Sequence, residues 1–421
     1  MNDKFTQKCS KLKIVLFSAI MVVACIIGLA FFARPAVSEN EKRELTKFPR
    51  FTIESFLSGE YTSQVSLWFA DTYPLREPMI QANATFNQLY GIKDEQIVGG
   101  GNADDIPSGP ADIEFNPTDD GGGQGIEGLY LNGSTAYQLY FFNKQNSDSY
   151  VSLINTFASQ VDGKANVYNM IVPLHCEIAL SKDTIAKYNA SSCSDAIEYM
   201  YSNLSDSVTP VDVTPILKAH NNEYLYFRTD HHWTARGAYY SYVSFCRQKG
   251  IEPNELSSYK PLKFNGFLGT FYSEAKQPAA MKSDPDFVEA FVPNGTNDAT
   301  VYDSRGSKLA EYAVVYTKAD KYSAGNKYLC FIGGDNPLTE IHNPNIDDGS
   351  SIVVVKESYG NAFVPFLVDS YEHVYVIDYR YWNGHLADFV EKNGIDDVLF
   401  LNVVNNTSTS ARLKELNLII N

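Results

Sequence analysis

Two short segments of this 421-residue sequence carry the residue types of acid–base and nucleophilic chemistry. The first is Thr-Asp-His-His-Trp-Thr at positions 229–234, which ends where a segment with helical spacing begins. Asp230 and His232 are two residues apart, and side chains at i and i+2 of an extended segment share a face. We therefore predict that Asp230 accepts a hydrogen bond from one imidazole nitrogen of His232, so that the other nitrogen can act as a base. The alternative is that His232 is a buried structural histidine.

His231 raises the question of a metal site. Adjacent residues of an extended segment point to opposite faces, so His231 and His232 are poorly placed to bind one ion together. We expect His231 to serve structure. We predict neither a metal nor a cofactor, because no His/Cys spacing typical of zinc occurs in the sequence.

The second segment supplies a nucleophile. Ser358 follows the aliphatic run Ile352–Val355, which is typical of a buried strand, and precedes a segment expected to be helical at residues 361–367. At such a turn the backbone N–H groups of the helix N-terminus point outward and can stabilise an oxyanion. The alternative is that Ser358 is only a helix N-cap, which is a common use of serine.

Taken together, residues 229–234 and the segment Lys-Glu-Ser-Tyr-Gly-Asn at 356–361 resemble the bacterial DHHW protein family. That family is similar to the alginate O-acetyltransferase (AlgX/AlgJ) group of SGNH-hydrolase-like enzymes. The order Asp230, His232, Ser358 is the permuted order of the alginate group. Further stretches that support the resemblance are Asn40–Leu45, Phe48-Pro49, Gly266–Tyr272 and Val376–Tyr381.

The resemblance implies a role for each residue. Ser358 is expected to be the nucleophile, His232 the base, and Asp230 the residue that orients the imidazole. In the superfamily the oxyanion is bound by the serine N–H, a glycine N–H and an asparagine side chain. Asn402 and Asn405 are the candidates for that asparagine.

The chain also departs from the superfamily pattern. Lys356 and Glu357 stand where ordinary SGNH hydrolases have Gly-Asp before the serine. The resemblance implies O-acetyl transfer onto an exported polysaccharide, with a multi-pass membrane O-acyltransferase as the acetyl donor. A carbohydrate acetyl esterase with the same residues is an alternative, and so is a non-catalytic protein that binds or assembles the polysaccharide.

The elements that must position these residues follow Gly128. Aliphatic runs of strand length alternate there with helical segments, which is typical of a mostly parallel sheet covered on both faces. We predict a three-layer α/β/α sandwich for residues 128–421, which the resemblance makes a permuted SGNH-hydrolase-like catalytic domain. Since catalytic groups of such sheets lie beyond the carboxyl ends of the strands, Ser358 and His232 should meet there at about 2.6–3.2 Å. Strands are expected at residues 167–172, 224–228, 312–316, 328–332, 352–355, 374–377 and 398–401, and helices at 194–204, 234–247, 361–367 and 386–392.

A transmembrane signal anchor is predicted at residues 14–32, a run without a charged residue. Four lysines precede it, so residues 1–13 are expected in the cytoplasm and the rest of the chain outside the cell membrane. A cleaved signal peptide and a lipidated Cys25 are the alternatives. Residues 33–95 are expected to form a stalk and helical collar, and residues 96–127 an acidic loop rich in Gly and Pro.

The composition excludes some classes of protein. With 44% hydrophobic residues the chain can bury a large core, which excludes global disorder. A formal net charge of −16 argues against nucleic-acid binding, which needs clustered Lys and Arg. Because an exported chain can be oxidised, Cys176 and Cys193, which are close in sequence, are predicted to form a disulfide.

Overall fold

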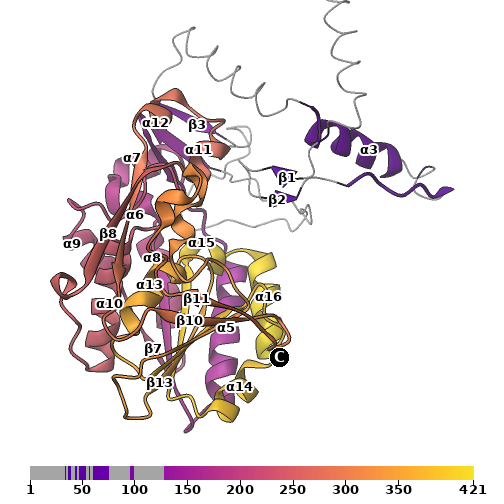
Figure 1. The fold of residues 1–421 in the computed structure, drawn as a ribbon. Helices are drawn as coiled ribbons and strands as arrows, with labels where there is room; N and C mark the ends of the chain where they lie inside the picture. The colour runs from indigo at the N-terminus through magenta and orange to yellow at the C-terminus, as the bar shows by residue number, and fades with distance from the viewer. Residues whose placement is uncertain are drawn as a thin grey trace, which may run out of the picture. The chain divides into compact units, whose positions relative to one another are not determined.

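The computed structural model divides into two compact units, one of residues 1–92 with 276–279 and one of residues 93–275 with 280–421 (Figure 1). No helix within the described ranges is long and apolar enough to cross a membrane, and the predicted anchor at residues 14–32 lies outside those ranges. The cytoplasmic end predicted for residues 1–13 lies outside them as well. The structure describes residues 34, 37–38, 43–44, 47–53, 56, 60–74, 95–98 and 128–421.

The larger unit is built on one large sheet, which has eight strands among the described residues. Their spatial order is β11 (Lys308–Ala313), β10 (Asp298–Tyr302), β12 (Leu338–His342), β14 (His373–Asp378), β13 (Ser351–Lys356), β15 (Asp397–Val403), β6 (Asn166–Val172) and β7 (Val208–Pro210). The run from β14 to β7 is parallel, whereas β12, β10 and β11 form an antiparallel edge. The predicted mostly parallel sheet is confirmed, with an antiparallel edge that the strand pattern did not indicate.

The parallel strands lie at the centre of the core. Every residue of β13 and β15 is buried, as near-continuous aliphatic runs require. The chain passes from β13 through α13 (Gly360–Leu367) to β14, and then through α14 (Leu386–Asn393) back past β13 to β15. Right-handed crossovers that run in opposite directions place α13 and α14 on opposite faces of the sheet.

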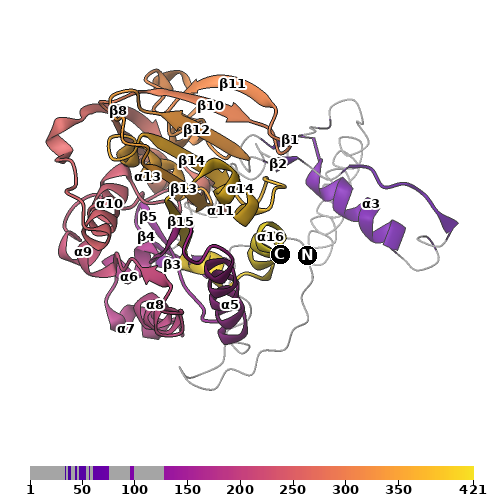
Figure 2. The same ribbon diagram turned by 90° about the horizontal axis from the view of Figure 1, so that it is seen from below.

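Helices therefore cover both faces of the sheet, as Figure 2 shows. On one face α10 (Ala235–Lys249) contacts α13. On the other face α16 (Ser410–Ile420) contacts both α14 and α5 (Lys144–Gln160). Further described helices are α6 (His175–Ala179), α7 (Lys182–Lys187), α8 (Cys193–Ser202), α9 (Thr214–Ala219), α11 (Thr270–Glu274), α12 (Ala279–Ser283) and α15 (Val404–Thr407), with 3-10 turns at Leu256–Ser258, Ala319–Lys321 and Ala324–Cys330.

Two smaller sheets belong to the same chain region. β8 (Lys260–Phe267) pairs with β9 (Asp286–Val292), and β4 (Leu129–Asn132) pairs with β5 (Thr135–Gln138) and β3 (Glu95–Val98). The prediction of a loop at residues 96–127 is therefore wrong for residues 96–98, which belong to β3. The glycine run begins only at residue 99. The rest of that predicted loop lies outside the described residues.

The smaller unit contains α3 (Glu60–Asp71) and a two-stranded pairing of β1 (Val37–Ser38) with β2 (Arg43–Glu44). The Arg34 guanidinium lies over the Trp68 ring, 4.0 Å from its centroid, and donates to Thr72 Oγ1 at 2.7 Å. A helix thus occurs in the region predicted as a collar, while the role of residues 33–95 as a stalk stays a prediction.

Two local sequence signals predicted helix ends of the larger unit correctly. The Thr234 side chain caps α10 by accepting from the Gly237 N–H, and Gly394 ends α14 in the left-handed conformation at φ 61°. Two strand predictions are wrong, because residues 224–228 form only a single bridge at Tyr226 and residues 328–332 begin within a 3-10 turn. Aromatic and aliphatic side chains at these positions fill the core in irregular segments instead.

The predicted disulfide is not formed. Cys176 and Cys193 are free thiols, each with 0% of its surface exposed. Burial raises the pKa of the Cys193 thiol, and a hydrogen bond with Cys176 raises it further. The two sulfurs are therefore neighbours, as the spacing suggested, but they pack as small apolar groups.

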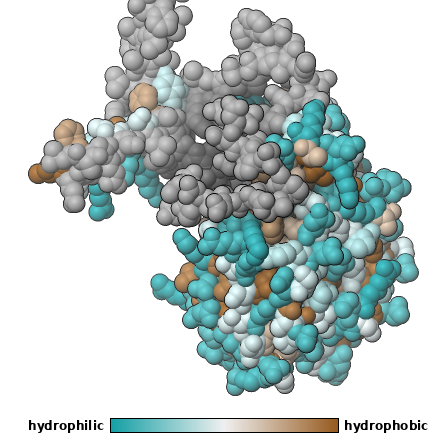
Figure 3. Space-filling model, turned by 180° about the vertical axis from the view of Figure 1, so that it is seen from behind, coloured by the Kyte–Doolittle hydropathy of each residue, from teal (hydrophilic) through white to brown (hydrophobic). Residues whose placement is uncertain are grey.

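The surface of the larger unit is mainly hydrophilic on the face that Figure 3 shows, with hydrophobic side chains scattered singly. Such a surface suits the excess of acidic over basic residues in the sequence. Single exposed apolar residues are normal for a soluble fold.

Candidate active site

The Asp-His-His-Trp segment is a tight bend held at both ends. A β-bridge joins Tyr226 to Trp233, and the Phe227 N–H donates to the His232 carbonyl at 3.2 Å. At the start of the bend, the buried Asp286 carboxylate accepts from the Thr229 N–H and hydroxyl, both at 2.7 Å. These bonds fix the backbone on either side of the segment before α10 begins.

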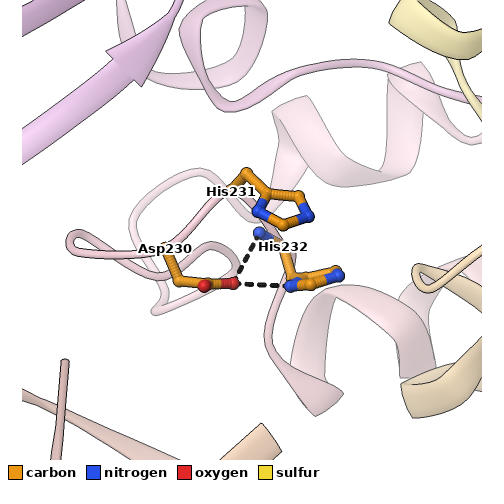
Figure 4. Close-up of side chains that lie close together, drawn as sticks. All are labelled: Asp230, His231 and His232. Atoms are coloured by element: carbon orange, nitrogen blue, oxygen red, sulfur yellow. Dashed lines mark hydrogen bonds and ion pairs between the residues drawn. The ribbon is translucent and has the colours of Figure 1, made fainter. Parts of the chain in front are cut away.

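Asp230 and His232 make the predicted contact (Figure 4). Asp230 Oδ1 lies 2.5 Å from His232 Nδ1 and also accepts from the His232 backbone N–H at 3.1 Å. Since an ionised carboxylate can only accept, the Nδ1 atom carries a proton and Nε2 presents its lone pair. The contact between the two residues was predicted correctly, but the backbone geometry was not. The Asp230 side chain accepts from the backbone N–H two residues further on, which makes a turn and not an extended strand.

Ser358 lies on the far side of the imidazole. Its Oγ atom is 2.8 Å from His232 Nε2, within the range predicted from the sequence. Asp230 and His232 are 3% and 7% exposed, whereas Ser358 is partly exposed. We call these three hydrogen-bonded residues the Ser358 array. It lies beyond the carboxyl end of β13, where the strand gives way to α13.

Gly269 and Thr270 hold the second oxygen of Asp230. The Thr270 N–H donates to Asp230 Oδ2 at 2.8 Å, and its hydroxyl donates at 3.1 Å. A Cβ atom on Gly269 would lie 2.2 Å from that same oxygen, so the close approach requires glycine. Both oxygens of the carboxylate are therefore bonded, which fixes its orientation toward the imidazole.

Aromatic residues tie the bend to the serine turn. The Tyr328 ring stacks on His232, with centroids 4.0 Å apart, and its hydroxyl donates to the Ser358 carbonyl at 3.0 Å. Trp233 Nε1 donates to the Tyr359 carbonyl at 2.9 Å, and the Tyr359 hydroxyl donates to the His231 carbonyl. The array is thus positioned by three hydrogen bonds outside it and by one stacked ring.

Glu357 has a structural role in this turn. The buried carboxylate accepts from the Val403 N–H at 2.9 Å and from the Tyr359 N–H at 3.1 Å. The Ser358 hydroxyl lies 3.3 Å from it, farther than from His232. Glu357 therefore ties the serine turn to the end of β15 without displacing the contact between serine and histidine.

Lys356 belongs to a charge cluster beside the array, in which Lys356 and Asp378 are buried and Asp335 is partly exposed. Its Nζ atom donates to Asp378 at 2.8 Å and to Asp335 at 3.3 Å, and Arg380 Nη2 bonds the same two carboxylates at 2.6 and 2.9 Å. Burial would raise the pKa of Asp335, but the charges of Lys356 and Arg380 lower it well below its usual value. Asn361 Nδ2 donates to Asp335 at 2.9 Å, which ties the cluster to the first turn of α13.

The backbone N–H of Ser358 is available to a ligand. No described residue accepts a hydrogen bond from the Ser358 N–H, which precedes α13. The amide of Asn402 lies in a buried network, where its oxygen accepts from the Tyr379 hydroxyl at 2.8 Å and its nitrogen lies 3.4 Å from the Tyr150 hydroxyl. Asn405 lies in α15, with no hydrogen bond to Ser358. An oxyanion role for either asparagine stays a prediction.

His231 does not point away from His232, contrary to our expectation. The two ring centroids are 3.8 Å apart, and a bend rather than a strand explains why the alternation of faces does not apply. Asp230, His231 and His232 could in principle offer ligand atoms to one ion. However, the His231 Nδ1 atom lies 2.6 Å from Thr270 Oγ1, and Ser358 faces His232 Nε2. The arrangement therefore fits acid–base chemistry better than metal binding.

Several positioning residues could not have been singled out from the sequence. Tyr328 is one of 28 tyrosines, and nothing in its neighbourhood marks it. Gly269-Thr270 lies within a stretch that supports the family resemblance, which is the only signal for it. The partners Asp335 and Asp378 come from separate strand ends and are brought together only by the sheet.

A parallel sheet with Asp230, His232 and Ser358 gathered beyond one strand end defines an α/β protein with a site fit for acyl transfer. The chain belongs to the DHHW protein family, whose model matches residues 41–121 and 109–377. A comparison with curated protein sequences gave no match.

The chain is also similar to solved structures. The crystal structure of a DHHW family protein from Eubacterium siraeum is 31% identical in sequence, covers 72% of this chain and 98% of its own, and has a TM-score of 0.64. PatB1 of Bacillus cereus, solved with a sulfonyl adduct, is 17% identical, covers 68% and 98%, and has a TM-score of 0.56. The O-acetyltransferase domain of Pseudomonas putida AlgJ is 12% identical, covers 67% and 95%, and has a TM-score of 0.40.

Proposed function

We propose that this protein is an O-acetyltransferase with a permuted SGNH-hydrolase-like fold, and that it acetylates an exported polysaccharide. Ser358 is the nucleophile, His232 the general base, and Asp230 orients the imidazole. The observation that carries the proposal is the continuous hydrogen-bonded row from Asp230 Oδ1 through His232 to Ser358 Oγ, at 2.5 and 2.8 Å. The choice of acetyl group and acceptor rests on the similarity of the DHHW family to the alginate O-acetyltransferase group.

The geometry accounts for each step of a two-stage transfer. Ser358 Oγ attacks the acetyl carbonyl while His232 Nε2 takes the hydroxyl proton, and the resulting imidazolium is stabilised by Asp230. The oxyanion of the tetrahedral intermediate faces the Ser358 N–H. When the intermediate collapses, the donor oxygen leaves with the proton from His232, and acetyl-Ser358 remains.

A sugar hydroxyl then attacks the acetyl-serine. His232 removes the proton of that hydroxyl and returns it to Ser358 Oγ as the acetyl-serine bond breaks. Water can attack the same intermediate, which would make the protein an acetyl esterase.

The proposal extends to the placement of the protein. The apolar run at residues 14–32 would anchor the chain in the cell membrane with residues 1–13 in the cytoplasm and the site outside. The anchor would hold the site near a multi-pass membrane O-acyltransferase that supplies acetyl groups, which raises their effective concentration. Deletion of residues 14–32 should release the protein from the membrane fraction, and its retention there would contradict the anchor.

The test of the chemistry is to trap the acyl-enzyme. The full-length chain is incubated with p-nitrophenyl acetate, quenched in acid and mapped by mass spectrometry, and a sulfonyl fluoride serves as a second probe. We expect acetyl and sulfonyl marks on Ser358, none in Ser358→Ala, and an unchanged reaction in Ser159→Ala, which alters an exposed serine of α5.

The fate of the acetyl group separates the candidate functions. Acetylated sugar formed when an oligosaccharide is added supports transfer, whereas free acetate at the same rate with and without sugar supports an esterase. A chain that binds the oligosaccharide but never acquires a mark on Ser358 would be a non-catalytic polysaccharide-binding protein, which would contradict the proposal.

A further inference from the structure

A second cluster of histidine and carboxylate lies at the other end of the sheet. His342 is the last residue of β12 and His373 the first of β14, and the two are directly opposite each other in the antiparallel pairing. In the parallel pairing, His373 is the partner of Ser351, the first residue of β13. Ser358 lies two residues beyond Lys356, the last residue of that strand, so the two ends are about 20 Å apart, at about 3.3 Å per residue.

The side chains of this cluster converge on one oxygen. Glu372 Oε1 lies 3.3 Å from His373 Nε2 and 3.8 Å from His342 Nε2, and one ligand atom from each residue lies within 4.8 Å of the others. Around a tetrahedral zinc ion with ligand bonds of about 2.0–2.1 Å, ligand atoms are about 3.3 Å apart. One spacing already matches, and small side-chain rotations would bring the other two into range.

Glu372 is held in place by its other oxygen. Oε2 accepts from the Gly349 N–H at 2.7 Å and from the Asp348 N–H at 3.0 Å, while the Glu372 N–H donates to Ser350 Oγ at 3.1 Å. Such backbone bonds to the outer oxygen orient a ligating carboxylate and leave the inner oxygen for the metal.

The cluster is open to solvent on the histidine side. The side chains of His342 and His373 are 57% and 38% exposed, whereas that of Glu372 is 15% exposed. An ion can therefore enter directly, and water can fill a fourth position. Two imidazoles and one carboxylate are a ligand set that suits zinc and disfavours magnesium or calcium, which prefer oxygen ligands.

We propose that His342, Glu372 and His373 form a Zn²⁺ site that clips the antiparallel edge of the sheet to its parallel part. The clip joins β12 directly to β14, the first parallel strand, at the end of the sheet remote from Ser358. A site in this place stabilises the fold and takes no part in acyl transfer, so the inference is independent of the proposed function.

The test is a zinc titration of the metal-free full-length chain by calorimetry, repeated with Co²⁺ to record the visible spectrum of a tetrahedral site. We expect one Zn²⁺ per chain to bind and to raise the unfolding temperature. His342→Asn and His373→Asn should abolish this binding, and Glu372→Gln should weaken it at least about tenfold. All three residues lie at the ends of β12 and β14 or next to them, outside the core of the sheet. Circular dichroism checks that the variants fold.

A matched control and a rival site keep the test decisive. His385 pairs with the Asp388 carboxylate at 3.4 Å and offers one histidine and one carboxylate without a second imidazole. His385→Asn should bind zinc as tightly as the unaltered chain. If the His342→Asn/His373→Asn double variant keeps its zinc, or if zinc is lost only when His231 is replaced, the proposal is wrong.

Discussion

The two ends of the parallel sheet each carry histidine beside a carboxylate, but in environments that favour different chemistry. At the carboxyl end, His232 is 7% exposed, with Asp230 on one ring nitrogen and a serine hydroxyl on the other. At the amino end, two more exposed histidines face one oxygen of Glu372. A single buried imidazole between an acceptor and a hydroxyl is suited to move a proton, whereas two accessible imidazoles are suited to share an ion.

The supporting bonds differ in the same way. His232 is fixed by a stacked Tyr328 ring and by the bend that Asp230 closes. At the amino end the His342 and His373 rings stack on each other, with centroids 4.8 Å apart, and backbone hydrogen bonds go to the Glu372 carboxylate. Because different residues hold the histidines at the two ends, changes at the two ends should have separable effects.

Replacement of the nucleophile should have the largest effect. If the proposed function is right, Ser358→Ala should lower kcat of acyl transfer by about 10⁶-fold, which is the effect of losing the serine in Ser-His-Asp enzymes. The unfolding temperature should change little, because the Glu357 and Tyr328 bonds to the turn do not use the serine hydroxyl as their main partner. His373→Asn at the other end should keep full activity. A loss of activity in this variant would show that the two ends of the sheet do not have separate roles.

Replacement of the orienting carboxylate should have the second largest effect. Asp230→Asn should lower kcat by about 10⁴-fold, because an amide can donate to Nδ1 and so favour the wrong tautomer of His232. Stopped-flow measurement of p-nitrophenol release tests this directly. The matched change at the amino end, Glu372→Gln, should leave the rate unchanged, and equal losses in both variants would show that the carboxylates act only through stability.

The sequence predicted the central strands and the reacting residues for physical reasons that are local. The aliphatic runs of β13 and β15 predict buried parallel strands, and Gly394 predicts the end of α14. The pair Asp230 and His232 is also local, since two residues separate them. Even so, the expected strand geometry was wrong, because the carboxylate bonds the His232 N–H and turns the chain.

What the sequence could not predict depends on contacts between distant segments. Tyr328 reaches Ser358 across thirty residues, and the bend reaches the serine turn across 126. His342 and His373 meet only because β12 runs antiparallel to β14, and the prediction of a mostly parallel sheet gave no reason to pair them. Hydrophobic periodicity identifies strands, but strand order at an edge is decided by packing of the whole sheet.

A smaller effect is expected from the hydroxyl that positions the serine turn. Tyr328→Phe removes the 3.0 Å bond to the Ser358 carbonyl but keeps the ring stacked on His232. Loss of one such bond costs about 1 kcal/mol, so we expect kcat to fall about fivefold with little change in KM. Tyr322→Phe, which removes a hydroxyl that bonds Tyr312 instead, is the control and should leave kcat unchanged. A loss of only KM in Tyr328→Phe would mean that this tyrosine binds substrate.

The smallest effect is a change in how stability depends on pH, and it has opposite signs at the two ends. Loss of hydration next to neighbouring atoms and the nearby charge of Asp230 raise the pKa of Glu274 from its usual 4.5 to about 8, although the residue keeps an exposed surface. The folded chain therefore holds a proton that the unfolded chain has lost, and Glu274 makes stability fall as pH rises from about 4.5 to 8. The lowered pKa of Glu372 has the reverse consequence, since its stabilisation is present above its usual pKa and is lost as pH falls through the folded one.

Unfolding temperatures measured from about pH 2 to about 9 separate these two glutamates. Glu274→Gln should flatten the decline between about 4.5 and 8 and leave the acid limb unchanged. Glu372→Gln should do the opposite, with a shallower acid limb and the same decline at higher pH. If Glu274→Gln alters only the acid limb, Glu274 ionises at its ordinary pKa. The surroundings at the carboxyl end of the sheet then do not favour its neutral, protonated form.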